Sequence, residues 1–238
     1  MLNNLANGSV LVIGGSSGIG LATAQAALRL GAHVTIASND VERLRAASAN
    51  FDSPVCLCRI DTRSSESVES AFNDGPFFDH VVVSASATQS GPVRGLPLDQ
   101  AYASMDSKFW GAYRVARAAK IGHGGSLTFV SGFLSRRPSA GAVLQGAINA
   151  AIEGLVRGLA LEFAPVRVNA VSPGLIDTPI YSKLSEEKCS ALYENTRQHL
   201  PVGRIGTAAD IAQAILFLAT NPYTTGTVVT VNGGGTIA

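Results

Sequence analysis

The chain has 238 residues, and its 18 lysines and arginines against 17 aspartates and glutamates give a net charge of +1. With 46% hydrophobic and 15% charged residues, this balance argues against disorder, nucleic-acid binding and attraction to an anionic membrane, and no apolar run reaches the roughly 18 to 20 residues of a membrane helix. Three cysteines, an odd and sparse set, and an N-terminus without a basic signal region indicate a cytoplasmic protein.

Short apolar runs alternate along the chain with segments that carry apolar residues at helical spacing. The runs predict strands at 10–13, 34–37, 55–60, 80–83, 127–130, 166–171 and 228–231. The periodic segments predict helices at 19–30, 41–49, 64–72, 98–119, 144–163 and 208–218.

Strands that are apolar on both faces and alternate with helices indicate an α/β protein. We expect one domain over residues 1–238, a three-layer, doubly wound parallel sheet of about seven strands, which is a Rossmann fold. Residues 177–207 form a long stretch without a clear pattern. Because long unpatterned loops in compact domains are usually functional or mobile, we expect a substrate loop there.

A glycine-rich turn follows the first predicted strand. The turn reads Gly14-Gly15-Ser16-Ser17-Gly18-Ile19-Gly20 and leads directly into the first predicted helix. Glycines at such a junction let the backbone approach a pyrophosphate, which binds to the free N–H groups of the helix N-terminus. The Gly-x-x-x-Gly-x-Gly spacing differs from the usual Rossmann fingerprint and resembles that of the short-chain dehydrogenase/reductase family. Further matches to that family are Asp61-Thr62, Asn169-Ala170-Val171-Ser172-Pro173-Gly174 and Val231-Asn232-Gly233-Gly234.

The resemblance implies hydride transfer between a nicotinamide dinucleotide and a small carbonyl or alcohol. It also implies a homodimer or homotetramer and no metal. The residues that we expect to bind the cofactor are Gly14, Ser16, Ser17, Gly18, Ile19, Gly20, Ser38, Asn39, Arg43, Asp61, Thr62, Ser84, Ala85, Pro173, Gly174, Ile176 and Thr178.

The residues after the second predicted strand favour NADP(H) over NAD(H). Ser38 stands where NAD-binding folds often hold an acid for the ribose 2′-hydroxyl, so no carboxylate repels a 2′-phosphate. Ser38 and Asn39 can donate hydrogen bonds, and Arg43 lies one helical turn further on. The same residues are also good helix caps, and both roles can hold at once.

The catalytic positions of the family do not match this sequence. Members of the family carry a Tyr-x-x-x-Lys pair on the helix after the fifth strand, a serine at the end of that strand and an asparagine on the preceding helix. Alignment by the resemblance places Gln145 at the tyrosine, Asn149 at the lysine and Lys108 at the asparagine, with the serine falling on Ser131 or Gly132. We hypothesise that lysine and asparagine have exchanged places; the alternative is that Lys108 extends into solvent.

A glutamine has no proton to give at neutral pH, so Gln145 cannot act as a general acid. The sequence therefore predicts an atypical NADP(H)-dependent oxidoreductase that reduces a small carbonyl, quinone or activated alkene without the family tyrosine. The alternative is a cofactor-binding pseudoenzyme that serves as a sensor or partner subunit. A lyase or dehalogenase on the same scaffold is disfavoured, since such relatives tend to lose the glycine-rich turn. Tyr181 is a further candidate acid, and Arg136-Arg137 is more typical of a solvated pair than of an anion site.

Overall fold

The computed structural model describes residues 5–73, 75–179 and 185–238. Seven parallel strands form the main sheet, in the order β3-β2-β1-β4-β5-β6-β9. Their bounds are β1 Ser9–Ile13, β2 His33–Ser38, β3 Cys56–Arg59, β4 Phe78–Val83, β5 Ile121–Val130, β6 Arg167–Pro173 and β9 Val228–Val231. The predicted fold class, a doubly wound parallel sheet of seven strands, is confirmed.

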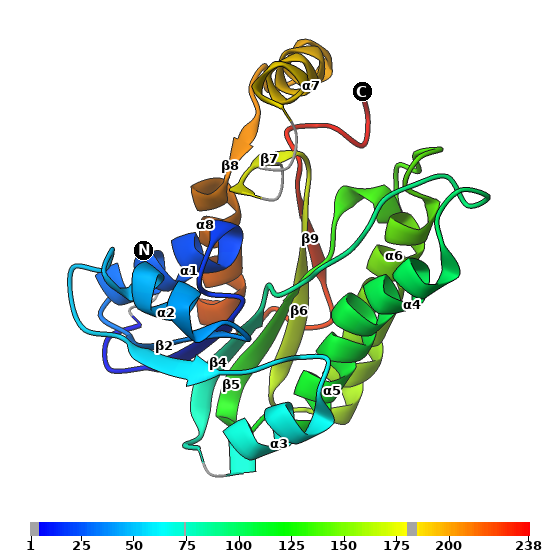
Figure 1. The fold of residues 1–238 in the computed structure, drawn as a ribbon. Coiled ribbons are helices and arrows are strands. Elements are labelled where there is room, and N and C mark those ends of the chain that lie inside the picture. Colours follow the sequence, from blue (N-terminus) through cyan, green and yellow to red (C-terminus); the bar gives the residue numbers. More distant parts are fainter. Residues whose placement is uncertain (1–4, 74, 180–184) are drawn as a thin grey trace.

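Helices cover both faces of this sheet (Figure 1). One layer holds α1 (Gly18–Arg29), α2 (Val41–Ser48) and α8 (Ala208–Thr220). The other holds α3 (Ser65–Asn73), α4 (Leu98–Met105), α5 (Gly111–Ala118) and α6 (Val143–Glu162). Within the described ranges, no helix is both long and apolar enough to cross a membrane.

The central strand β1 shows why both layers form. Its side chains alternate between the faces of the sheet, so Val10 and Val12 join the core under α1 and α8, whereas Leu11 and Ile13 join the core under α5 and α6. The order of strands reverses between β1 and β4. In open α/β sheets ligands bind at the carboxyl ends of the strands beside such a reversal.

Two segments differ from the prediction. The expected helix 98–119 is interrupted by a π-helical turn, Asp106–Trp110, which separates α4 from α5. The expected loop 177–207 contains α7 (Glu186–His199) and a two-strand ribbon of β7 (Ile176–Asp177) and β8 (Gly206–Thr207). Ser185 caps α7 by accepting from the Lys188 N–H, and Glu186 and Glu187 lie in its first turn, where negative charge is favourable.

Candidate active site

The glycine-rich turn is held against β2, because Gly14 and Gly15 donate their N–H groups to the Ala37 carbonyl, and it leads into a start of α1 that has no side-chain cap. Gly14 has φ +89°, and a Cβ on it would meet the Ala85 backbone nitrogen at 2.6 Å, so only glycine fits between β1 and the loop after β4. Ser17 is the N-cap of α1 but makes no side-chain cap, and the first turn holds no acidic residue. The backbone N–H groups in the first turn of α1 therefore have no side-chain acceptor at the N-cap, and they fit a pyrophosphate.

Ser38, Asn39 and Arg43 surround the start of α2, at the end of β2. Asp40 caps the helix by accepting from the Arg43 N–H at 3.0 Å, and this hydrogen bond holds the pKa of the carboxyl below its usual range. The Arg43 side chain donates to Asp40 at 2.9 Å and to the Asn39 side-chain oxygen at 3.4 Å. The exposed Arg43 guanidinium thus lies at the start of α2 and is paired with the carboxylate of its N-cap, Asp40.

The other predicted nucleotide contacts come from the ends of β3 and β4. The Asp61 carboxylate accepts two hydrogen bonds from the Arg63 guanidinium, at 3.0 and 2.8 Å, which lower its pKa. Thr62 is buried and its carbonyl accepts from Arg114 at 3.2 Å. Ser84 and Ala85 both donate their N–H groups to the Ile13 carbonyl, which fixes the loop after β4 against the glycine-rich turn.

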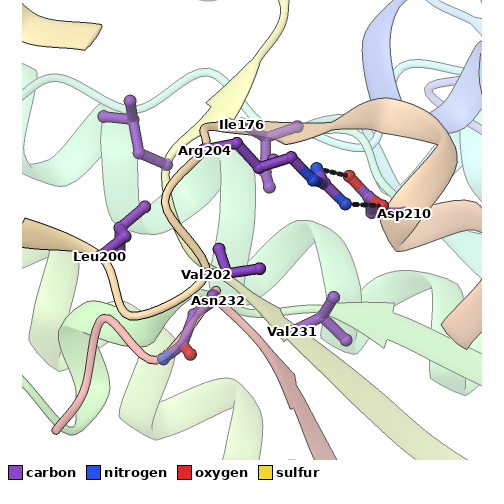
Figure 2. A pocket seen from close by; sticks show the side chains of 10 residues that line it. Ile176, Leu200, Val202, Arg204, Asp210, Val231 and Asn232 are labelled. Carbon is purple, nitrogen blue, oxygen red and sulfur yellow. Dashed lines mark hydrogen bonds and ion pairs between the residues drawn. The ribbon is translucent and has the colours of Figure 1, made fainter. Parts of the chain in front are cut away.

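The segment after β6 closes the same edge of the sheet. A Cβ on Gly18 would lie 3.5 Å from Thr178, so this segment reaches the start of α1. Beside it is a cavity of about 190 Å³, and Figure 2 shows the Arg204–Asp210 ion pair on its rim, with N–O distances of 2.7 and 2.8 Å. The lining is mostly apolar: Leu175, Ile176, Leu200, Val202, Arg204, Gly206, Asp210, Val231, Asn232 and Gly233.

Lys108 points into the molecule rather than into solvent. It lies in the π-helical turn, and its Nζ donates to Asn149 Oδ1 at 2.7 Å and to the Ser131 carbonyl at 2.8 Å. Burial lowers the pKa of the Lys108 ammonium to about 8, against an opposing attraction from the Glu153 carboxylate. Lysine from one helix and asparagine from the other therefore meet at the end of β5.

Gln145, one helical turn before Asn149, is held by the loop after β4. Its Oε1 accepts from the Ser90 hydroxyl at 2.6 Å, and its Nε2 lies 3.3 Å from Thr88 Oγ1. The same loop is also anchored to the π-helical turn between α4 and α5, because the Ala87 N–H donates to the Ser107 hydroxyl at 2.8 Å. The Gln145 amide is thus oriented from both ends.

Ser131 and Gly132 face different ways at the end of β5. The Ser131 hydroxyl is buried and donates to Glu153 Oε1 at 3.1 Å, so it is turned toward α6. A Cβ on Gly132 would meet Asn149 Nδ2 at 2.7 Å. A serine side chain facing the Lys108–Asn149 contact would have to stand at 132, where this sequence has glycine.

Known proteins of similar sequence identify the family. A family model described as "Enoyl-(Acyl carrier protein) reductase" matches residues 13–236. The short-chain dehydrogenase/reductase ATR9 of Stachybotrys chlorohalonatus is 32% identical over 246 residues, which cover 95% of this chain and 96% of that protein. The chain belongs to the short-chain dehydrogenase/reductase family. The 3-oxoacyl-[acyl-carrier-protein] reductase of Mus musculus is 28% identical over 233 residues, covering 94% of this chain and 95% of that one. A solved small-chain dehydrogenase in complex with NADPH is 38% identical with a TM-score of 0.87, covering 98% of this chain and all of that one.

This short-chain dehydrogenase/reductase gathers most of its predicted site residues at one edge of the sheet. The residues predicted to bind the cofactor lie at the ends of β1 to β4 and in the segment after β6, and Lys108, Asn149 and Gln145 lie at the end of β5. Tyr181 lies outside the described residues. Arg137 donates to the Gly235 carbonyl at 2.7 Å and so serves to hold the C-terminal segment. Among the described residues, no three His, Cys, Asp or Glu side chains are grouped to hold a metal ion.

Sequence reasoning missed two features of this dehydrogenase/reductase site. Glu153 is buried on α6, with 7% of its surface exposed, and accepts hydrogen bonds from Ser131 and Ser135. Its spacing of four residues from Asn149 was a usable signal, since such residues share a helix face. Tyr193 on α7 donates to the Asp177 carboxylate at 2.9 Å, and burial raises its pKa. No pattern marked α7, so this contact had no signal.

Proposed function

We propose that this chain is an NADP(H)-dependent reductase in which Lys108 replaces the family's tyrosine–lysine pair as the source of positive charge and of a proton. The observation that carries the proposal is the placement of the Lys108 ammonium, 2.7 Å from Asn149 Oδ1 at the end of β5. The sequence supports it, because none of the five tyrosines is followed four residues later by a lysine.

The residues around the first two strands fit a phosphorylated dinucleotide. The glycine-rich turn and the uncapped start of α1 suit the pyrophosphate, and the exposed Arg43 guanidinium suits a 2′-phosphate next to Ser38 and Asn39. The Asp40 charge is balanced by Arg43, so it adds little repulsion. A relative with 38% identity binds NADPH, in keeping with this choice.

Bound NADPH supplies a hydride to the substrate carbon, and this chain's residues then have to neutralise the charge on the substrate oxygen. Two of the three Lys108 N–H donors bind neutral oxygens of the described residues, which leaves the third for a substrate oxygen. A pKa of about 8 keeps the ammonium charged at neutral pH while making it a better acid than an exposed lysine. The Gln145 amide, oriented by Ser90 and Thr88, can donate a hydrogen bond but no proton.

This chemistry favours electron-poor acceptors. A quinone, an activated alkene or a small activated carbonyl spreads or stabilises the negative charge, so a weaker acid suffices than for a simple ketone. Positioning of the substrate against the cofactor supplies a further part of the barrier reduction. We therefore propose a small electron-poor acceptor as the substrate class.

The test combines cofactor binding with turnover. NADPH and NADH are titrated while the fluorescence of Trp110, the single tryptophan, is followed, and consumption of each reduced cofactor is then measured against a panel of quinones, enones and ketones. We expect NADPH to bind at least ten-fold more tightly than NADH, because Arg43 engages its extra phosphate. Turnover should be greatest with quinones and enones.

The lysine role is tested by Lys108→Met, with Lys120→Met as the matched control. Lys120 donates to the Asn73 carbonyl at the opposite end of the sheet. We expect Lys108→Met to lower kcat about 100-fold, since a positioned general acid contributes about that much, and the control to keep the parent rate. Tight NADPH binding without oxidation by any acceptor would instead favour the pseudoenzyme, and equal rates for both variants would remove Lys108 from the chemistry.

A further inference from the structure

Glu153 is a buried carboxylate near the Lys108–Asn149 contact, and it has no part in the proposed function. Glu153 follows Asn149 by four residues on α6, so both side chains project from one face of the helix. Only 7% of its surface is exposed. Burying a carboxylate is costly unless its charge is balanced and its oxygens are hydrogen-bonded, so Glu153 must have partners nearby.

Two hydroxyls supply the hydrogen bonds. Ser135 donates to Glu153 Oε1 at 2.6 Å, and Ser131 donates to the same oxygen at 3.1 Å. None of the ion pairs within 4.0 Å among the described residues includes Glu153. Its hydrogen-bond donors here are thus neutral hydroxyls, and the Lys108 ammonium attracts it from beyond ion-pair distance.

Ser131 links this carboxylate to Lys108. The Ser131 hydroxyl binds Glu153, whereas the Ser131 carbonyl accepts from Lys108 Nζ at 2.8 Å. Asn149 accepts from the same ammonium at 2.7 Å, one helical turn before Glu153. Lysine and glutamate thus lie on either side of a single residue, near enough for attraction and separated by neutral groups.

The spacing matters for a proton donor. A lysine in direct contact with a carboxylate is held strongly in its charged form and gives up its proton reluctantly, whereas a buried lysine without a countercharge loses its proton too early. Glu153, separated from Lys108 by Ser131, lies between these extremes. Its attraction raises the pKa of Lys108 and offsets part of the larger lowering by burial.

We propose that Glu153 is a positioning residue that acts through Ser131 to keep the Lys108 ammonium charged and fixed at the end of β5. This assignment rests on the proposed function for its catalytic meaning, but the interaction itself exists in the protein without cofactor or substrate. Other charged groups near Lys108 do not replace it: Asp106, on the same π-helical turn, is paired with Arg114 at 2.6 Å.

The experiment measures the protonation of Lys108 directly. The sequence has four lysines, Lys108, Lys120, Lys183 and Lys188, so protein labelled with carbon-13 at the lysine ε-carbon gives few signals in an NMR titration. Lys108→Met assigns the signal of interest. Glu153→Gln keeps the shape and the acceptor oxygen but removes the charge, and Glu162→Gln on the exposed face of the same helix is the matched control.

We expect Glu153→Gln to move the protonation midpoint of Lys108 down by about one pH unit, since loss of an opposite charge at this range has about that effect. Glu162→Gln should leave the midpoint where it is in the parent. In turnover, the fall of kcat at alkaline pH should shift by the same amount in Glu153→Gln. An unchanged Lys108 midpoint in folded Glu153→Gln protein overturns the proposal, even if the enzyme is an active reductase. A shifted midpoint with no turnover by any variant upholds the Glu153–Lys108 interaction and refutes the proposed function instead.

Discussion

At the residue scale, the Lys108–Asn149 contact joins an ammonium and an amide from two separate helical segments. At the end of β5 the Lys108 ammonium donates to the Asn149 amide oxygen at 2.7 Å, and the proposed exchange predicts that the two groups could swap helices. The contact is therefore a unit, and changing one half of it leaves the other half without a partner.

Asn149→Lys tests this coupling. The new ammonium would lie against that of Lys108 in a buried setting, so we expect the free energy of unfolding to fall by about 3 kcal/mol. Lys108→Asn combined with Asn149→Lys restores one cation and one amide and should recover most of the loss. Urea denaturation of the four proteins gives the coupling energy. If the two changes simply add, the residues do not act as a pair.

The pairing of Lys108 with Asn149 could be hypothesised from the sequence, because the motifs around both residues fix the alignment. The orientation of Ser131 could not. Whether residue 131 or 132 faces the site depends on how the backbone leaves β5, and a shift of one residue along an extended strand reverses the side chain. Glu153 was missed for a related reason: its spacing from Asn149 indicates a shared helix face, but a carboxylate on a helix is normally exposed, and its burial follows only from the folded packing.

At the element scale, α7 differs from every other long helix. None of its residues is fully buried, and its half-buried residues, Cys189, Leu192, Tyr193 and Thr196, lie along one side. The apolar strands and amphipathic helices could be predicted from their periodicity, but the half-buried side of α7 carries too few strongly apolar residues to predict a helix. Specific contacts, including Tyr193 to Asp177 at 2.9 Å, tie this helix to β7.

Tyr193→Phe should loosen α7 without unfolding the sheet. Loss of one hydrogen bond to a carboxylate costs about 1 to 2 kcal/mol, and in a helix with no buried residue this loss acts locally. We expect amide hydrogen exchange to accelerate several-fold across residues 186–199 and to stay constant in β1 and β4. Tyr223→Phe, at a fully exposed tyrosine, is the control and should change neither. Uniform acceleration across the whole chain would mean that α7 unfolds only with the sheet.

At the scale of the whole molecule, the sheet has a polar group at the edge away from the active site. His80 on β4 lies with its Nδ1 2.9 Å from the Ser126 hydroxyl on β5, and burial lowers its pKa to about 4 from an ordinary 6.5. Between about pH 4 and pH 6.5 the His80 imidazole is therefore neutral in the folded protein and protonated in the unfolded chain. Stability from this group is complete above pH 6.5 and is lost as the pH falls toward 4.

His80→Asn should flatten the acid side of the stability profile. Asparagine retains a hydrogen-bonding group for Ser126 but does not titrate, so the free energy of unfolding should fall between pH 6.5 and 4.5 by about 2 kcal/mol less in the variant than in the parent. Urea denaturation at a series of pH values measures the difference. Parallel profiles for the two proteins would show that folding does not change the pKa of His80.

The π-helical turn between α4 and α5 makes the length of this segment important as well as its composition. A π turn holds one residue more than a regular turn, which rotates the two flanking helices about 100° relative to each other. This phase difference lets Ser104 and Ser107 hold the loop after β4 while Ala112 and Val115 pack on the sheet. Deleting one residue here would force a choice between the loop anchor and the core. We therefore expect that a related protein with a gap at 106–110 does not place a lysine ammonium at the end of β5, where Lys108 lies in this chain.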